Sequence, residues 1–180
     1  VTVDQSERLE QKIFANELDC ALIEGIAHNP NIVSEAYMED HLSVICGTDK
    51  GWTQGQVISI EDFQRQRFLL REKGSGTREV FNRVVEQAGF HITPVWEAMS
   101  TTALVNAAIN GLGIAVLPHR MILPALRQGL ICTVKVEGFG GSYGAVVLCA
   151  LFWKRCNWQG ALAGMLSGGL MVFVWKYLVP

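Results

Sequence analysis

The stretch LLREKGSGTREVF, residues 69–81, decides the fold of this chain. An apolar run ends at Arg71 and a helical pattern begins near Thr77. The glycine and serine residues between them let the backbone approach a ligand closely. The free N–H groups at a helix start, together with the helix dipole, favour an anion. We therefore expect a strand, a tight loop and a helix. The candidate ligand-binding residues are Ser75, Gly76, Thr77 and, less specifically, Arg78.

A second junction of this kind follows at residues 98–102, AMSTT, where Ser100, Thr101 and Thr102 succeed another strand-like run. Two polar helix starts that both follow strands can converge on one crevice at the carboxyl ends of a sheet. The first loop is not a standard phosphate-binding motif, because it lacks GxxxxGK[ST] and is too short for the dinucleotide fingerprint. Two interpretations stay open here. The hydroxyl side chains bind a ligand, or they only cap their helices.

Strand-like and helix-like segments alternate along most of the chain, which predicts an α/β fold with largely parallel strand pairing. The run CALI at residues 20–23 has the continuous apolar character of a buried parallel strand. Helices are expected to begin at or just after residues 6, 59, 77, 100 and 118. The expected strands lie at residues 1–3, 20–23, 32–37, 42–46, 68–70, 93–98, 114–117 and 130–136.

The charge distribution divides the chain into two parts. All 17 acidic residues fall between Asp4 and Glu137, although the net charge of the whole chain is only −2. The part before residue 138 is therefore net acidic, and it contains no helix-turn-helix pattern or basic stripe. Direct contact with DNA is not expected of this chain.

Cysteine and histidine residues give no sign of a metal or catalytic site. Cys20, Cys46 and Cys132 lie in apolar runs, and the five cysteines lack metal-like spacing. They are expected to be small buried hydrophobic residues in a reducing compartment. The four histidines are scattered, and there is no GxSxG motif or His beside a candidate nucleophile. We expect no catalytic residue, no metal, no cofactor and no enzymatic activity.

The last 43 residues have a different composition, since they contain no acidic residue and only three basic ones. The 20 uncharged residues 156–175 would be long enough for one membrane span. Gly160, Gly164 and Gly168 share a helical face, as in packed membrane helices, and Trp158 and Trp175 are placed like interfacial aromatics. The alternative is a buried helix of a soluble protein. We expect a hydrophobic, transmembrane-like helical tail over residues 141–180.

The strings ELDCALIEG, SEAYMEDHLSVIC, FLLREKGSGTREVFNRVVEQAG and STTALVNAAINGLGIAVLP occur in this order in the chain. Together they resemble the effector-binding domain of LysR-type transcriptional regulators, over about residues 1–137. The resemblance implies two Rossmann-like α/β subdomains similar to type II periplasmic binding proteins. It places an effector, a small anionic metabolite, in the cleft between them. It also implies that Ser75–Thr77, Ser100 and Thr101 line the cleft, and that the parent protein is a homodimer in the cytoplasm.

The sequence departs from this family at both ends. The DNA-binding helix-turn-helix is absent, as are the first strand and helix of the first subdomain, which is therefore expected to be incomplete. The expected division is residues 1–67, 68–132, a crossover at 133–140 and the tail at 141–180. The tail string GFGGSYGAVVLCALFWKRCNWQGALAGMLSGGLMVFVWK is similar to a transmembrane hairpin of sodium/solute symporters.

Two functions follow from these resemblances. The first is an effector-binding regulatory domain of a LysR-type regulator that lacks its DNA-binding part. The alternative is a fragment of a sodium/solute symporter, or a non-functional fusion of the two with a junction near Glu137. In either case the tail would associate with a membrane if it inserts.

Overall fold

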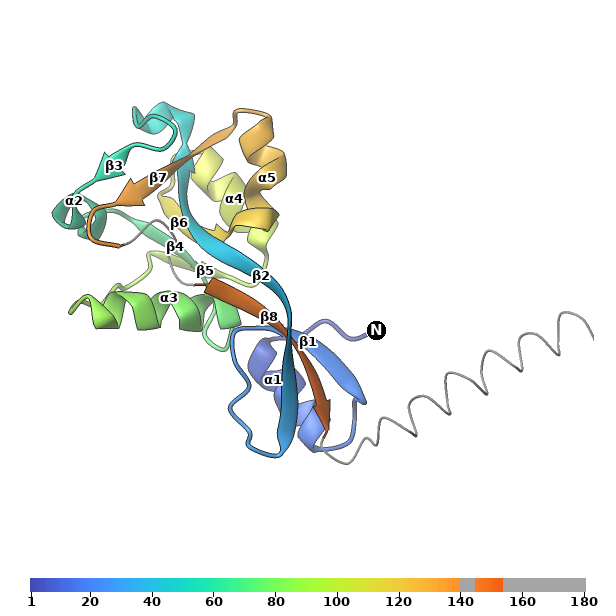
Figure 1. The fold of residues 1–180 in the computed structure, drawn as a ribbon. Coiled ribbons are helices and arrows are strands. Elements are labelled where there is room, and N and C mark those ends of the chain that lie inside the picture. The colour runs from blue at the N-terminus through green and yellow to red at the C-terminus, as the bar shows by residue number, and fades with distance from the viewer. Residues whose placement is uncertain (140–144, 154–180) are drawn as a thin grey trace, which may run out of the picture.

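The structure is a computed structural model and describes residues 1–139 and 145–153. Figure 1 shows the elements in two groups, which are joined by the long strand β2. The elements are α1 (Ser6–Phe14), β1 (Cys20–Glu24), β2 (Ile32–Gly47), the short 3-10 helix η1 (Thr48–Lys50), β3 (Val57–Ile58), α2 (Ile60–Gln64), β4 (Phe68–Arg71), α3 (Gly76–Gln87), β5 (Trp96–Ala98), α4 (Thr101–Ile109), β6 (Ile114–Pro118), α5 (His119–Arg127), β7 (Ile131–Val136) and β8 (Ala145–Trp153).

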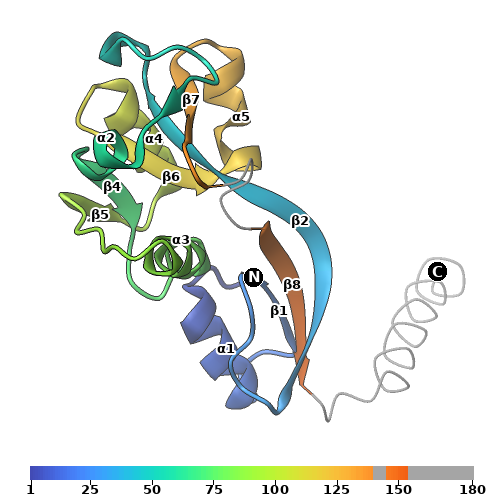
Figure 2. The ribbon, with the colours of Figure 1, turned by 60° about the vertical axis from the view of Figure 1, so that its left-hand side comes forward.

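One mixed sheet runs through both groups of elements. Its strand order is β1-β8-β2-β6-β4-β5, and β7 pairs with both β2 and β3. β4 is parallel to β5 and β6, whereas β2 is antiparallel to β6, β7 and β8. The α/β fold class is thus confirmed. The expectation of largely parallel pairing is wrong, because β2 and β8 run in opposite directions between the two groups (Figure 2).

Strand β2 is longer than its sequence pattern indicated. The two strands expected at 32–37 and 42–46 are one strand of 16 residues. Its first half pairs with β8 and its second half with β6 and β7, and a bulge lies between Ala36 and Met38. Because β8 pairs with residues 38–41, the polar residues in the middle of β2 stay in the strand. The strand expected at residues 1–3 is not formed; Val1 and Val3 are exposed there.

Strand β1 lies at the end of the sheet and is antiparallel to β8. The prediction of a buried parallel strand is therefore wrong at this place. Only one side of β1 is covered: Ile23 is buried, while Cys20 and Leu22 are exposed. Ile23 packs with Leu9 and Ile13 of α1 in a small apolar cluster. An alternating burial pattern suits an antiparallel strand with one solvated face.

The main core has two layers of helices, one on each face of the sheet. On one face, Phe63 of α2 and Phe81 of α3 pack against β2, β4, β6 and β7. On the other face, Leu104 of α4 and Ile122 of α5 pack against the alternate side chains of the same strands. Consecutive strand residues point to opposite faces, so the wholly apolar run of β6 is buried on both. These layers fix the carboxyl ends of β4 and β5.

Residues 145–153 form the strand β8 and not the expected hydrophobic helix. β8 is inserted between β1 and β2, which offer it two antiparallel partners. A short apolar run with β-branched residues satisfies a central strand as well as a helix, so its periodicity does not decide between them. The other residues of the expected tail, 141–144 and 154–180, which include the expected membrane span at 156–175, lie outside the described part. Within residues 1–139 and 145–153, no helix has the length and apolar character needed to cross a bilayer.

The hydrophobic clusters change within β2. Leu9, Ile13, Ile23 and Ile32 form one cluster, and Leu42 belongs to the main core. The expected subdomain boundaries at residues 67, 132 and 140 stay predictions.

Candidate functional site

The junction between β4 and α3 has the geometry that its sequence predicts. β4 is buried through Leu70, Gly74 turns the chain with a φ of +88°, and α3 begins at Gly76 with Ser75 as its N-cap. Gly76 lies against the end of β1, because a Cβ atom built on it would come within 1.8 Å of the carbonyl oxygen of Glu24. Only glycine allows this close approach between α3 and β1.

A carboxylate already lies beside the N-terminus of α3. The hydroxyl of Thr77 donates a hydrogen bond to the Glu24 side chain, and Thr77 itself is buried. The hydroxyl of Ser6 also contacts the carbonyl oxygen of Glu24, at 3.4 Å. The first turn of a helix has N–H groups without intrahelical partners and a positive dipole end, which attract a negative charge. Glu24 therefore meets the electrostatic preference of this helix start.

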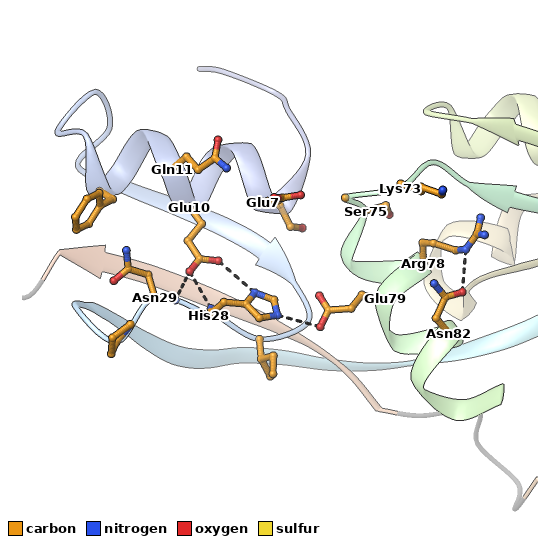
Figure 3. Close-up of a pocket in the computed structure, with 15 residues that line it drawn as sticks. Glu7, Glu10, Gln11, His28, Asn29, Lys73, Ser75, Arg78, Glu79 and Asn82 are labelled. Carbon is orange, nitrogen blue, oxygen red and sulfur yellow. Dashed lines mark hydrogen bonds and ion pairs between the residues drawn. The ribbon is translucent and has the colours of Figure 1, made fainter. Parts of the chain in front are cut away.

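A cavity of about 720 Å³ opens next to this contact, between α1 and the start of α3. Figure 3 shows Ser75, Lys73 and Arg78 on the side of α3, opposite Glu7, Glu10 and Gln11 of α1. Ser75 is 3 % exposed, and its side chain makes no capping hydrogen bond to α3. Of the seven predicted site residues, only Ser75 and Arg78 line this cavity.

His28 bridges the two sides of the cavity (Figure 3). Its Nε2 lies 3.0 Å from Oε1 of Glu79, and its Nδ1 lies 3.5 Å from Oε2 of Glu10. Partial burial lowers the pKa of His28, but the hydrogen bonds and charges of Glu79 and Glu10 outweigh this effect and raise the pKa overall. Glu10 also accepts hydrogen bonds from the backbone N–H groups of His28 and Asn29.

Arg78 is held by neighbours within its own half of the structure. Its guanidinium donates to Oδ1 of Asn82 at 2.9 Å, to the carbonyl oxygen of Arg71 at 3.0 Å and to Oε1 of Glu97 at 3.1 Å. Its ion pair is therefore with Glu97 of β5, a residue distant in the sequence. Arg78 is 7 % exposed. Its main effect is to hold the end of β4 against α3.

The second predicted junction does not open into the same cavity. The hydroxyl of Ser100 accepts a hydrogen bond from the N–H of Ala103 and so caps α4. Nη1 of Arg71 lies 3.5 Å from the hydroxyl of Thr101, which links the end of β4 to the start of α4. Ser100, Thr101 and Thr102 do not line the cavity described above. Arg71 thus connects the two junctions, and the cavity lies at the first junction only.

Sequence reasoning missed the acidic side of the site. Glu10 and His28 lie outside the quoted strings, and Glu24 lies in the string ELDCALIEG without a predicted role. Only the fold brings these three residues to α3. The Glu24-Gly25 pair was visible as the end of an apolar run, but nothing in the sequence indicated where that end lies. Among the described residues, no group of three or more His, Cys, Asp or Glu side chains is arranged to hold a metal ion.

Comparisons with known proteins define the family of this fold. The family model of the LysR substrate binding domain matches residues 1–151. The chain therefore belongs to the LysR substrate-binding domain family, and it is an effector-binding regulatory domain, not an enzyme. It is 27 % identical to the HTH-type transcriptional regulator CysL of Bacillus subtilis over 139 residues. This aligned segment covers 77 % of this chain and 46 % of CysL. The chain spans about half the length of the curated relatives it matches.

Solved structures share the fold. The regulatory domain of CcmR from Synechocystis PCC6803, in complex with 2-PG, superposes with a TM-score of 0.75 at 18 % identity, over 87 % of this chain and 74 % of that one. The effector-binding domain of QuiR in complex with shikimate gives a TM-score of 0.70 at 11 % identity, over 86 % and 71 % of the two chains. At these identities the likeness concerns the fold alone.

The C-terminal region has a separate relative. It is 58 % identical to the sodium/proline symporter of Haemophilus influenzae over 43 residues. This aligned segment covers 24 % of this chain and 8 % of the symporter. A match of 43 residues in a chain of 180 begins at residue 138 or earlier, so it overlaps the family match that ends at 151. The family-like part thus continues beyond Glu137. Strand β8 lies largely in the overlap.

Proposed function

We propose that this chain is the sensory domain of a LysR-type regulator for a small anionic metabolite, which binds at the N-terminus of α3. The observation that carries this proposal is the carboxylate of Glu24 at that helix start, where Thr77 donates to it. A site that holds a carboxylate of the chain has the donors that a carboxylate or phosphate ligand needs.

Ser75 and Lys73 supply further contacts for such a ligand. The buried hydroxyl of Ser75 lines the cavity and is not used to cap α3. Lys73 lines the same cavity from the loop before α3, and it adds the cation that a phosphate or carboxylate prefers. Arg78 is already paired with Glu97, so we assign it the role of holding this loop and not of binding the anion.

The size of the cavity and the ligands of similar proteins agree with this class of effector. A volume of about 720 Å³ lies in the usual range for small-molecule sites. The CcmR domain binds 2-phosphoglycolate and the QuiR domain binds shikimate, both small anions. Thr101, at the second junction, is proposed to contact the far end of a longer ligand across Arg71.

The complete protein would contain parts that this chain does not show. We propose that it regulates transcription as a cytoplasmic homodimer and that its DNA contacts lie outside this domain. A second candidate is membrane attachment through residues 154–180, which the 43-residue symporter match favours. Alkaline extraction of membranes from cells that express the full chain distinguishes membrane attachment from a cytoplasmic location. Only a chain that is inserted in the membrane stays in the pellet.

The binding proposal is tested by titration calorimetry of the full chain with 2-phosphoglycolate, shikimate and sulfate at fixed ionic strength. Loss of a hydrogen bond to a charged group is worth about 1.5–3 kcal/mol, so Ser75→Ala should weaken binding by roughly 10-fold or more. Thr102→Ala is the matched control, because it removes a helix-start hydroxyl outside the cavity. If none of the three anions binds, or if Ser75→Ala leaves their affinity unchanged, the proposed site is wrong.

A further inference from the structure

Cys46 and Cys132 face each other across the sheet. Cys46 lies in β2 and Cys132 in β7, and the two residues are direct partners in the antiparallel register. Their Sγ atoms are 3.2 Å apart, and both side chains belong to the main core. Directly opposite residues of antiparallel strands have Cα atoms about 4.5–5.5 Å apart, which lies within the range that a disulfide spans. Both backbones are thus already placed for a covalent link.

The two thiols lie in the main core, away from the proposed effector site. Both side chains are almost completely buried, and Cys132 donates to the carbonyl oxygen of Trp52 at 3.4 Å. The third described cysteine, Cys20, is exposed and lies on β1, in the other group of elements. Neither Cys46 nor Cys132 lines the cavity at α3. A contact between two sulfur atoms in an apolar core adds little that two alanine or valine residues would not supply.

We infer that Cys46 and Cys132 form a redox modification site, which closes to a disulfide when a small hydroperoxide reaches it and opens again with a dithiol. The inference is independent of the proposed effector. It follows from the register of β2 and β7 and from the distance of 3.2 Å between the sulfur atoms, which must shorten to about 2.05 Å in a disulfide. A small hydroperoxide is the fitting oxidant, because both sulfur atoms are buried in the core and a bulky oxidant would not reach them.

The reaction balances with hydrogen peroxide as the oxidant. The sulfur of Cys132, which is the less buried of the two, attacks one oxygen and breaks the O–O bond. The thiol proton leaves with the other oxygen as water, and Cys132 becomes a sulfenic acid. The sulfur of Cys46 then attacks the Cys132 sulfur, the S–O bond breaks, and the hydroxyl takes the Cys46 proton as a second water. Each cysteine gives up one electron, and the peroxide takes both.

The environment of the pair makes this step slow in the folded protein. Burial, followed by the neighbouring Cys132, raises the pKa of Cys46 to about 12, so its thiol stays protonated at neutral pH. The thiolate is the reactive form of cysteine, and a protonated pair therefore resists brief exposure. Once formed, the disulfide would close a loop from residue 46 to residue 132, which contains both Ser75 and Ser100. It would tie the second half of β2 to β7 and raise the thermal midpoint.

The test uses the full chain with Cys20, Cys149 and Cys156 replaced by serine, so that only the facing pair remains. The folded variant is treated with hydrogen peroxide, alkylated and measured by intact mass, and its peptides are mapped. The inference predicts a loss of about 2 Da, a Cys46–Cys132 linked peptide, and reversal by dithiothreitol. The same variant with Cys132→Ala is the control, and it should show no such loss.

Two results would overturn the inference. One is a variant that keeps two free thiols after prolonged exposure. The other is a variant that gains oxygen on Cys132 without forming the link. If the triple serine variant does not fold, the wild-type chain is cleaved after its glutamate residues and mapped, because this cleavage places Cys20, Cys46 and Cys132 in three different peptides. In that case a Cys46 linked to any other cysteine also contradicts the inference.

Discussion

Nε2 of His28 lies 3.0 Å from Oε1 of Glu79, and this contact joins the loop after β1 to α3 across the mouth of the cavity (Figure 3). Glu10 on α1 holds the other ring nitrogen at 3.5 Å. The two groups of elements thus contact each other by side chains, in addition to the shared strands. The contact therefore holds the loop after β1 and α3 together beside the cavity.

The contact at His28 should depend on pH. Because Glu79 and Glu10 raise the pKa of His28 in the folded state, protonated His28 stabilises the fold. This contribution is fully present below the ordinary pKa of 6.5 and is lost as the pH rises through the higher pKa of the folded state. His28→Gln should therefore lower the free energy of unfolding more at about pH 5.5 than at about pH 8.5, by up to ~1 kcal/mol for such a half-exposed pair.

Chemical denaturation at the two pH values measures this difference. Arg83→Gln is the control, because it removes the other partner of Glu79, at 2.8 Å, and leaves His28 in place. An equal effect of His28→Gln at both pH values would contradict the role given to its protonated form.

Glu24 should compete with the effector. Its carboxylate lies where a ligand anion is proposed to bind, so Glu24→Gln removes a negative charge but keeps the shape of the side chain. We expect the affinity for 2-phosphoglycolate, measured by calorimetry, to rise by roughly 10-fold, which corresponds to about 1.4 kcal/mol. Glu17→Gln, at an exposed position outside the cavity, is the control. A lower affinity of the Glu24 variant would show that this carboxylate orders the site instead of competing for it.

Gly76 should not tolerate a side chain. A Cβ atom at this position would overlap the carbonyl oxygen of Glu24, which is backbone and cannot move aside alone. We expect Gly76→Ala to lower the free energy of unfolding by about 1–3 kcal/mol, as overpacking does. Thermal and urea unfolding measure it, and Glu86→Ala on the exposed side of the same helix should have little effect. A fully stable Gly76→Ala protein would mean that β1 and α3 are not in contact in solution.

Phe63 is the aromatic centre of the main core. Its ring contacts Phe68, Phe81 and Phe139 edge to face, with centroid distances of 4.9, 6.5 and 6.0 Å, and its side chain is fully buried. Phe63→Ala should cost about 3–5 kcal/mol of unfolding free energy, because it removes this burial and leaves a cavity. Met121→Ala, at a residue that is 56 % exposed, should cost far less.

The local elements around the site were predictable from sequence. The loop before Gly76 and the cap at Ser100 follow from short-range chemistry, since glycine at a positive φ and a serine N-cap act within a few residues. The strand expected at residues 68–70 is formed as β4, and Phe68, Leu69 and Leu70 in it are buried.

Long-range pairing was not predictable in the same way. The run AVVLCALFW at 145–153 satisfies a central strand and an apolar helix equally, and only the open position between β1 and β2 decides for the strand. Glu24 and His28 reach α3 because β1 ends there, which depends on the register with β8. The site therefore combines a predictable donor loop with an acidic partner that only tertiary structure reveals.

The most direct test of the central claim is a titration of the ¹⁵N-labelled full chain with 2-phosphoglycolate, followed through its backbone amide signals. The account predicts that the amides of Ser75, Gly76 and Thr77 shift most and saturate, and that Ser75→Ala suppresses these shifts while Thr102→Ala retains them. Shifts that are largest elsewhere on the chain, or no saturable shift with 2-phosphoglycolate, shikimate or sulfate, would contradict an anion site at the start of α3.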